Sequence, residues 1–109
     1  MRVFISAPYS QGDEAANVRA AIDAAEQIRA AGHSPLCPHL SHFWHIIYPN
    51  TWEEWLRMDM EWLAVSDAVI RLPGDSVGAV MEVDKARELD IPIYYGVAAL
   101  LACGRADQR

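Results

Sequence analysis

The sequence predicts a small α/β fold of three layers, in which helices cover both faces of a sheet of four parallel strands. Two observations favour this fold. Short apolar runs of strand length alternate with longer stretches of helical period, and Gly, Pro or helix-capping residues separate them. A chain of 109 residues is long enough for one such domain and too short for two. We therefore expect a single domain over residues 1–109, with a polar tail from about residue 103.

The first predicted unit is a strand, a helix and a second strand. Residues 2–6 are apolar and β-branched enough for a central strand. Residues 33–38 make a weaker strand, because Pro35 cannot donate to a strand ladder and so indicates a sheet edge. Between them, Gly32 is a natural residue to follow a helix end. Helical spacing predicts a helix over residues 13–31, with one apolar face made of Val18, Ile22, Ala25 and Ile28.

The middle of the chain is its most aromatic part. Residues 38–50 show no clear period, and we expect them to be irregular. Thr51 and Glu54 fit a capping box, which predicts a helix over residues 52–65. One broad stripe of this helix carries an aspartate among apolar and aromatic residues, namely Trp52, Trp55, Leu56, Asp59, Trp62 and Leu63.

A buried strand and a helix with a carboxylate follow. Residues 67–72 are apolar enough for an interior strand, and residues 73–75 form a turn. Ser76 is a good N-cap for a helix over residues 77–89. Glu82 then lies about one turn inside that helix, near the sheet edge where open α/β folds bind ligands. The Glu82 carboxylate is either a reactive group or a charge at the start of the helix that the helix dipole stabilises.

The last predicted elements complete the sheet. Residues 91–95 form a fourth strand, residues 97–102 form one or two helical turns, and residues 104–109 form a polar tail that we expect to fray. Right-handed crossovers between parallel strands then give the strand order 2-1-3-4. This is the winding of a flavodoxin-like or Rossmann-like fold.

Composition and charge narrow the class of partner. The formal charge of −6 argues against a nucleic-acid polymer or an anionic membrane surface as the main partner. No apolar segment reaches membrane-spanning length, and the first residues do not resemble a secretory signal. Cys37 and Cys103 lack metal-type spacing, and we expect them to be reduced thiols. The sequence therefore predicts a cytoplasmic protein, and a small phosphorylated ligand stays possible.

Two features predict self-association. A four-stranded sheet leaves exposed edges, and the tryptophans of residues 52–65 offer more aromatic surface than one short helix buries alone. A symmetric assembly would cover both features. We therefore expect a homo-oligomer, either a dimer or a tetramer.

The first candidate for chemistry is the carboxylate pair Asp59 and Glu82. Cleavage of a glycosidic bond with retention needs one carboxylate as nucleophile and another as acid and base, about 5 Å apart. The predicted positions of the two residues allow them to meet at one edge of the sheet. The alternative is that Asp59 is a structural group paired with a nearby cation such as Arg57 or Arg71.

Three histidines, His39, His42 and His45, follow one another at steps of three residues. No carboxylate recurs at ligand spacing beside them, so the pattern disfavours a metal site. We expect His39, at the end of the second strand, to line the mouth of a pocket. His42 and His45 are expected at the surface or at an interface.

The loop after the first strand is the third candidate site. Ser6, Pro8, Tyr9 and Gly12 belong to a turn that can offer hydroxyl and backbone N–H groups to a polar ligand. The alternative is that this turn is only a tight connection between strand and helix. In the later helix, Gly78 would let a ligand approach the first turn closely.

Taken together, these segments resemble the nucleoside 2-deoxyribosyltransferase superfamily, and in particular its small bacterial members. The resemblance covers nearly the whole chain to Tyr95. The most specific part is the S-x-G-x-x-x-E pattern from Ser76 to Glu82, with Asp67-Ala-Val69 before it. The other matching segments are Phe4-Ile-Ser-Ala-Pro-Tyr9, Asn17, Pro38-His39, Asp59-Met-Glu-Trp-Leu63 and Leu72-Pro-Gly74.

The resemblance implies a chemical role for both carboxylates. Glu82 would attack the anomeric carbon of a nucleoside to form a glycosyl-enzyme, and Asp59 would handle the proton of the departing base. Transfer to another base or to water would follow, without a cofactor. Larger relatives continue past the fourth strand with a fifth strand and a segment that reaches a neighbouring subunit. The residues that would contact the substrate are Ser6, Pro8, Tyr9, Gly12, His39, Ser76 and Gly78.

One position bears on the substrate within this resemblance. Six residues before the nucleophile, the free-nucleoside transferases tend to carry an aspartate, whereas the monophosphate N-hydrolases carry a serine. Ser76 therefore favours a nucleoside 5′-monophosphate and hydrolysis, with Arg71 as a candidate basic partner of the phosphate. Two other classes of function stay open: a nucleotide-binding or sensing module without turnover, and an interaction protein that uses the aromatic stripe.

Overall fold

The computed structural model describes residues 1–107, with side chains through residue 103. Helices and strands alternate along the chain, and a short 3-10 turn and a short helix follow the second strand. The elements are β1 (Arg2–Ser6), α1 (Glu14–Ala30), β2 (Ser34–Leu36), η1 (Pro38–Leu40), α2 (Ser41–Ile47), α3 (Trp52–Ala64), β3 (Ala68–Arg71), α4 (Val77–Glu88), β4 (Ile93–Tyr95) and α5 (Val97–Asp107).

The sheet has the predicted parallel topology. Its four strands lie in the order β2-β1-β3-β4. In the register, Phe4 of β1 faces Leu36 on one side and Val69 on the other. Pro35 lies in the edge strand β2, where a missing ladder donor costs least. The prediction of a three-layer flavodoxin-like or Rossmann-like fold is confirmed.

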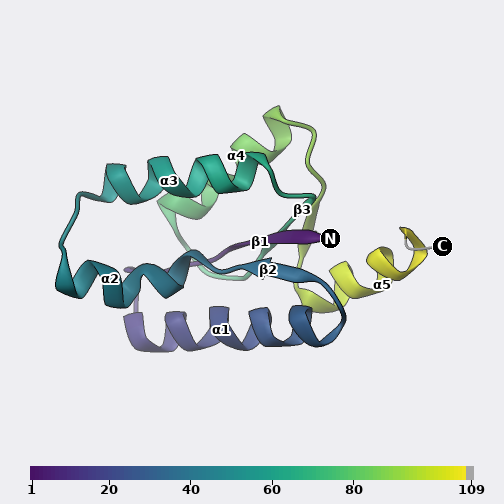
Figure 1. Ribbon diagram of the computed structural model, residues 1–109, viewed down its shortest axis with the longest axis horizontal. Helices are drawn as coiled ribbons and strands as arrows, with labels where there is room; N and C mark the ends of the chain where they lie inside the picture. The colour runs from purple at the N-terminus through teal and green to yellow at the C-terminus, as the bar shows by residue number, and fades with distance from the viewer. Residues whose placement is uncertain (108–109) are drawn as a thin grey trace.

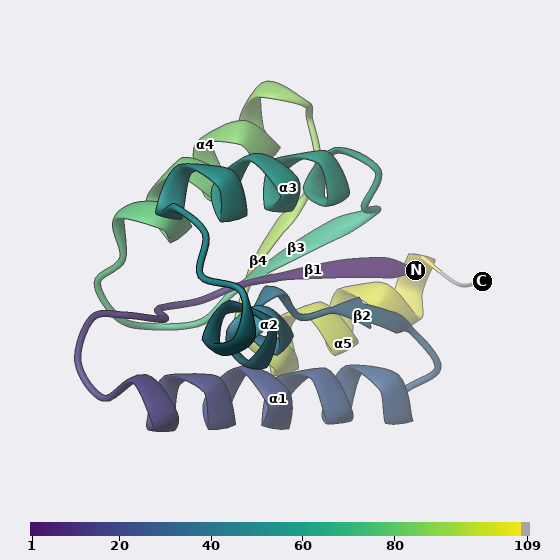
Figure 2. The same cartoon turned by 60° about the vertical axis from the view of Figure 1, so that its left-hand side comes forward.

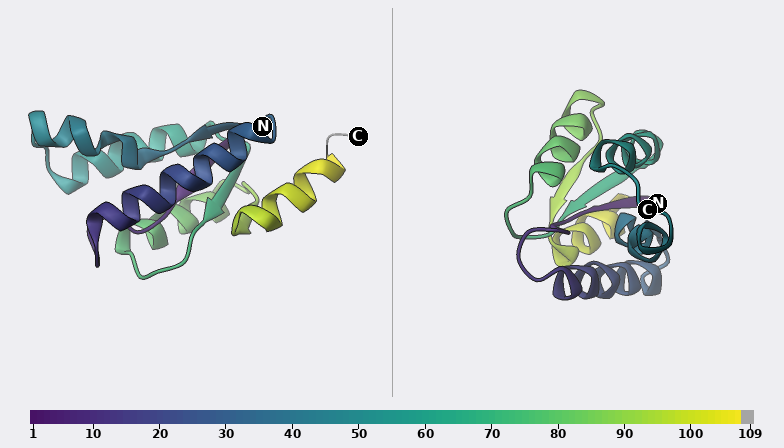
Figure 3. Two further views of the ribbon diagram at one scale, coloured as in Figure 1. Left: turned by 90° about the horizontal axis from the view of Figure 1, so that it is seen from below. Right: turned by 90° about the vertical axis from the view of Figure 1, so that its left-hand side faces the viewer.

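Two pairs of helices cover the sheet. In Figure 2, α1 and α5 lie below the sheet, and α3 and α4 lie above it. The right-hand view of Figure 3 shows the same three layers. The short helix α2 lies beside the ends of α1 and α3, at the opposite end of the molecule from the two chain termini (Figure 1). Strand β1 runs from the termini toward that end.

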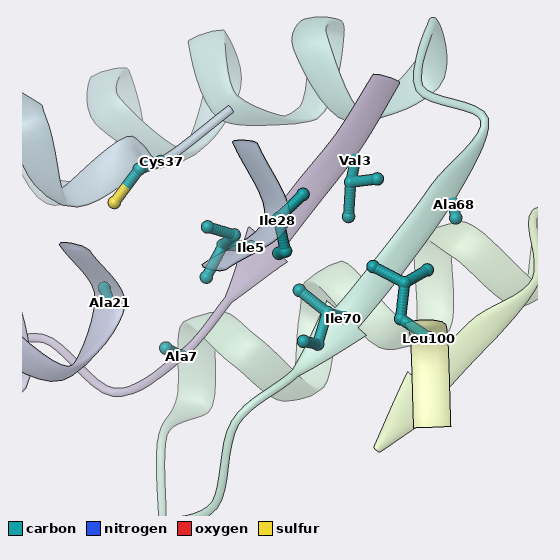
Figure 4. Packing of buried hydrophobic residues seen from close by; sticks show 9 residues of the cluster. All are labelled: Val3, Ile5, Ala7, Ala21, Ile28, Cys37, Ala68, Ile70 and Leu100. Carbon is teal, nitrogen blue, oxygen red and sulfur yellow. The ribbon is translucent and has the colours of Figure 1, made fainter. Parts of the chain in front are cut away.

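The larger core lies between the sheet and the pair α1 and α5. Val3, Ile5 and Ile70 point from the strands toward Ile28 and Leu100 (Figure 4). On α1 the buried residues are Ala21, Ala24 and Ile28, whereas Ile22 is 40% exposed. The buried stripe of α1 is therefore rotated from the predicted one, and it carries two small alanine side chains.

Local capping follows the sequence prediction closely. The Ser76 hydroxyl accepts a hydrogen bond from the Ala79 N–H at 3.1 Å, and α4 begins at the next residue, Val77. The Thr51 hydroxyl likewise accepts from the Glu54 N–H at 3.2 Å. Gly32 adopts a φ of 93° directly after the end of α1.

Two segments differ from their predictions. Residues 38–50 were expected to be irregular, but they form η1 and α2. The helix after β4 was expected to end near residue 102, but α5 continues to Asp107, so the predicted frayed tail is wrong for residues 104–107. Residues 108–109 of that tail lie outside the described residues. No helix in the described part of the chain is long and apolar enough to cross a membrane.

Candidate functional site

A cavity of about 740 Å³ opens at the carboxyl end of the sheet. Its walls come from the loop after β1, from the start of α1, from η1 and α2, from α3 and from the first two turns of α4. This is the edge where open parallel α/β sheets bind their ligands. Asp59 of α3 and Glu82 of α4 both line it.

Glu82 is a buried acid held by one neutral donor. Its side chain is only 6% exposed, and its Oε1 accepts a hydrogen bond from the Ser6 hydroxyl at 2.8 Å. Burial is the main reason why the pKa of Glu82 is raised to about 8, and the negative charge of Asp59 adds a smaller contribution to this rise. The Ser6 hydrogen bond and the positive charge of Arg71 act in the opposite direction.

Asp59 has no hydrogen-bond or ion-pair partner among the described residues. Burial raises its pKa to about 7. The alternative of a structural ion pair is wrong, because Arg57 pairs with Glu54 and Glu61. Asp59 and Glu82 line the same cavity, and the charge of Asp59 acts on Glu82.

Arg71 also forms no ion pair with Asp59. Its guanidinium donates hydrogen bonds to the backbone carbonyls of Leu72 and Gly74 in the loop after β3. It does not line the cavity. The expectation that Arg71 serves as a basic partner of a bound phosphate in this cavity is therefore not met.

The neighbours of Asp59 on α3 differ from the expected stripe. Trp52 and Trp55 line the cavity, but Trp62 does not and is 59% exposed. Trp62 lies about two helical turns beyond Trp55, near the end of α3 that is far from the cavity. Its indole therefore contributes nothing to the wall around Asp59.

A second titratable cluster lines the cavity on the side of α1 and α2. The Tyr9 hydroxyl and His42 Nδ1 are 2.6 Å apart, and His42 Nδ1 is 3.5 Å from a carboxylate oxygen of Glu14. Burial and the Glu14 charge raise the pKa of Tyr9. This cluster supplies hydroxyl, imidazole and carboxylate groups that can exchange protons or hydrogen-bond a polar ligand.

His45 is fixed in one tautomer. Its Nδ1 accepts hydrogen bonds from the Trp55 indole N–H at 2.8 Å and from the Asn50 backbone N–H at 3.3 Å. In the neutral ring the proton is therefore on Nε2. Edge-to-face packing of Trp44 and Trp55, with ring centroids 5.0 Å apart, holds α2 against α3.

His42 and His45, which were expected at the surface or at an interface, are half-buried, and both line the cavity. Their spacing of three residues suits one side of a short helix. That signal was available in the sequence, but it is informative only once residues 41–47 are recognised as helical.

His39 lines the cavity, as the sequence predicted. Its Nε2 donates to the Pro8 carbonyl oxygen at 2.8 Å, and the side chain is 5% exposed. Burial lowers the pKa of His39, so the ring stays neutral. Its buried Nδ1 has no hydrogen-bond partner among the described residues.

Of the other predicted contact residues, Tyr9, Ser76 and Gly78 line the cavity. Ser6 reaches it only through Glu82. Pro8 and Gly12 do not line it. Pro8 instead packs against Gly74, where an added Cβ would lie 2.7 Å from the proline Cγ.

Gly12 faces open space, since no atom lies within 4 Å of the position of a Cβ. Its φ of 82° serves the turn into α1. Asn17 holds this loop, because its side-chain amide donates to the carbonyls of Tyr9 and Gln11 at 2.9 and 2.7 Å. No group of three metal-ligating side chains is found among the described residues.

The sequence matches one family model over most of its length. A family described as "Domain of unknown function (DUF7768)" matches residues 1–96, which is most of the chain. The chain belongs to this family. A search of curated sequences finds no significant match.

A solved structure of a 2-deoxyribosyltransferase from the psychrotolerant bacterium Bacillus psychrosaccharolyticus matches this member of the family with a TM-score of 0.61. The two sequences are 18% identical, and the match covers 85% of this chain and 69% of that one. That protein is described as a biocatalyst for the synthesis of nucleosides. At this level of identity the likeness establishes a shared fold.

Proposed function

We propose that this protein cleaves the N-glycosidic bond of a nucleoside through a covalent glycosyl-enzyme. One observation carries the proposal: Asp59 and Glu82, from two different helices, line one cavity at the carboxyl edge of the sheet and both have raised pKa values. Perturbed acids of this kind gather where acid–base chemistry occurs. The likeness of fold to a 2-deoxyribosyltransferase supports the same chemistry.

In the proposed reaction Glu82 acts as the nucleophile. Its ionised carboxylate attacks C1′ of the sugar, and the bond between C1′ and the base nitrogen breaks with its electron pair going to the base. Asp59, whose pKa of about 7 leaves part of its population protonated at neutral pH, gives a proton to a neutral departing base. Water or a second base then attacks C1′ and releases Glu82 as a carboxylate. Ser6 favours the reactive form of Glu82, because its hydroxyl hydrogen-bonds the charged oxygen.

The structure favours a nucleoside over its 5′-monophosphate as the substrate. Ser76, which in the sequence indicated a phosphate, uses its hydroxyl to cap α4. No Lys or Arg lines the cavity in the part of the chain that the structure describes. A phosphate dianion would therefore meet the carboxyl groups of Asp59 and Glu82 without a cationic side chain beside it.

The test is an assay for free base. Incubation with a panel of nucleosides and their monophosphates, analysed by chromatography, should yield base from nucleosides, and Glu82→Ala should lower the rate by about 10³-fold or more. Glu53→Ala is the matched control, because Glu53 is exposed on α3 and does not line the cavity. No release from any member of the panel, with or without a second base as acceptor, would contradict the proposal.

A sensing module without turnover is the second candidate. It is favoured by the pKa of Glu82 of about 8, which leaves much of this carboxyl protonated and weakly nucleophilic at neutral pH. A titration calorimetry signal for a nucleoside, together with no base release at pH 9, would support binding alone.

We also propose a homo-oligomer. Helix α2 has no buried residue in the described chain, and its apolar side chains Phe43, Ile46 and Ile47 are 61–70% exposed. Burying such side chains against a second copy would remove them from water. Light scattering at micromolar concentration should report at least a dimer, and a clean monomer would contradict this.

A further inference from the structure

The charges that face the cavity have one sign. Three carboxyl groups line it, Glu14 from α1, Asp59 from α3 and Glu82 from α4. Among the described residues no Lys or Arg lines it, and its other titratable groups are Tyr9 and the three histidines. Arg71 lies near enough to lower the pKa of Glu82, but its guanidinium is committed to backbone carbonyls.

The two inner carboxyl groups also lack a counter-ion. Carboxylates elsewhere on the described surface, such as Asp23 and Glu54, pair with arginines. Asp59 has no such partner, and Glu82 has only the neutral Ser6 hydroxyl, although it is 6% exposed. Burying an uncompensated carboxylate is costly, so these groups stay partly protonated without a ligand. A cation between them would remove that cost.

Aromatic side chains form a further part of the wall. Tyr9, Trp52 and Trp55 all line the cavity. The faces of such rings attract flat organic cations, and Trp attracts them most strongly. Trp55 is held in place by its hydrogen bond to His45 and by its ring contact with Trp44. Carboxyl groups and aromatic walls together suit a flat positively charged ligand.

Accepting the proposed N-glycosidase function, we propose that the preferred substrate is an N-glycoside whose base carries a fixed positive charge, such as an N-alkylated purine nucleoside or a pyridinium nucleoside. Its sugar would present C1′ to Glu82. Its cationic base would lie among Asp59, Trp52 and Trp55.

The fixed charge changes the chemistry of the leaving group. When Glu82 attacks C1′ and the bond to nitrogen breaks, the electron pair neutralises the cationic base, which leaves without taking up a proton. Water then attacks C1′ of the ester, Glu82 departs as a carboxylate, and the proton from water goes to Asp59 or to solvent. The bound cation also favours the ionised form of Glu82, which is the nucleophile. Asp59 therefore supplies charge in this reaction, whereas a neutral base would need its proton.

The test compares two substrates that differ by one methyl group and one charge. 7-Methylguanosine and guanosine, in ribo and 2′-deoxyribo forms, are incubated with the protein and free base is measured. Each rate is corrected by the rate without enzyme. We expect kcat/KM for the methylated nucleoside to exceed that for guanosine by about tenfold or more beyond the ratio of the uncatalysed rates.

Asp59→Asn separates charge from proton transfer. We expect this variant to lose about 10²-fold in base release from guanosine, but only about tenfold from 7-methylguanosine, mostly through a higher KM. Glu53→Gln removes one negative charge from the exposed side of the same helix. It should leave the rate of base release unchanged for both substrates. An equal loss on both substrates, or an effect of Glu53→Gln as large as that of Asp59→Asn, would overturn the inference.

Failure of the inference is distinguishable from failure of the proposed function. If guanine is released but kcat/KM for 7-methylguanosine does not exceed that for guanosine as expected, the inference is overturned and the proposed function stays in place. Without release from either nucleoside, the function fails, and titration calorimetry then tests the cavity alone. Tighter binding of 7-methylguanosine than of guanosine supports a cation site, and equal or absent binding overturns it.

Discussion

The two faces of the sheet are built differently. The face covered by α1 and α5 holds a wholly apolar cluster, with Ile5, Ile28, Ile70 and Leu100 all fully buried. The face covered by α3 and α4 holds a smaller apolar cluster around Phe4 and buries the Ser6–Glu82 pair beside it. Residues alternate between faces along β1, so the same strand serves both.

This difference separates stability from chemistry. Apolar burial on the first face stabilises the fold without any cost for polar groups. The second face accepts a carboxyl group whose ionised form is disfavoured by its surroundings, which is a property useful for a reaction and harmful to stability. Substitutions on the apolar face should therefore lower stability and leave activity unchanged. Removal of the carboxyl group on the other face should lower activity and raise stability.

The largest expected effect is on the pH dependence of stability. The pKa of Glu82 is raised to about 8, so the folded state binds more protons than the unfolded state between about pH 4.5 and 8. Its contribution to the free energy of unfolding therefore falls as the pH rises through that window. Glu82→Gln should raise the free energy of unfolding by a few kcal/mol at pH 9 and by about zero at pH 5. Urea titrations at both values measure this.

The control for this prediction is Glu53→Gln on the exposed side of α3, which should have little effect at either pH. An equal change for Glu82→Gln at pH 5 and pH 9 would show that the two faces do not differ in this way.

The second effect belongs to the apolar face. Ile28→Ala should lower the free energy of unfolding by about 2–5 kcal/mol, because it leaves a cavity in the larger core. Ile22→Ala, the same change on a side chain of α1 that is 40% exposed, should cost less. Base release per folded molecule should stay the same in both. A changed pH profile of activity in Ile28→Ala would contradict the prediction that the apolar face affects stability alone.

The third effect is on proton transfer. Asp59→Asn should reduce base release from neutral nucleosides by about 10²-fold. In the wild type, the active form needs Glu82 ionised and Asp59 protonated, so this activity should be highest between about pH 7 and 8 and should fall at higher pH, where Asp59 loses the proton that it donates. Because Asp59 and Glu82 interact, the profile reports the pair. Steady-state rates from pH 5 to 9 test this, and an unchanged alkaline limb in the variant would contradict the role of Asp59.

The smallest effect comes from Ser6. Ser6→Ala removes the hydrogen bond that favours ionised Glu82, so the pKa of Glu82 should rise and the acidic limb of the rate profile should move to higher pH. The rate at pH 7 should fall about tenfold. Ser66→Ala, which removes a hydroxyl bonded to the Trp62 carbonyl, is the control. A lower rate with no shift of the acidic limb would mean that Ser6 does not act through Glu82.

Local patterns were sufficient for most of the fold. The capping serine at residue 76, the edge proline at residue 35 and the apolar runs of β1 and β3 act over a few residues, and each predicted its element correctly. Helix α2 was missed because its stability depends on Trp44 and His45 meeting Trp55 of α3, which no local pattern contains.

The sequence by itself determined the order of strands and helices, since hydrophobic period, caps and breakers are properties of neighbouring residues. It also placed one acid on each of two helices. Only the tertiary structure decided that the Ser6 hydroxyl bonds Glu82, 76 residues away, and that Asp59 and two unexpected histidines share the cavity. The reason is physical: burial, charge and hydrogen bonding between distant residues depend on how the helices pack on the sheet.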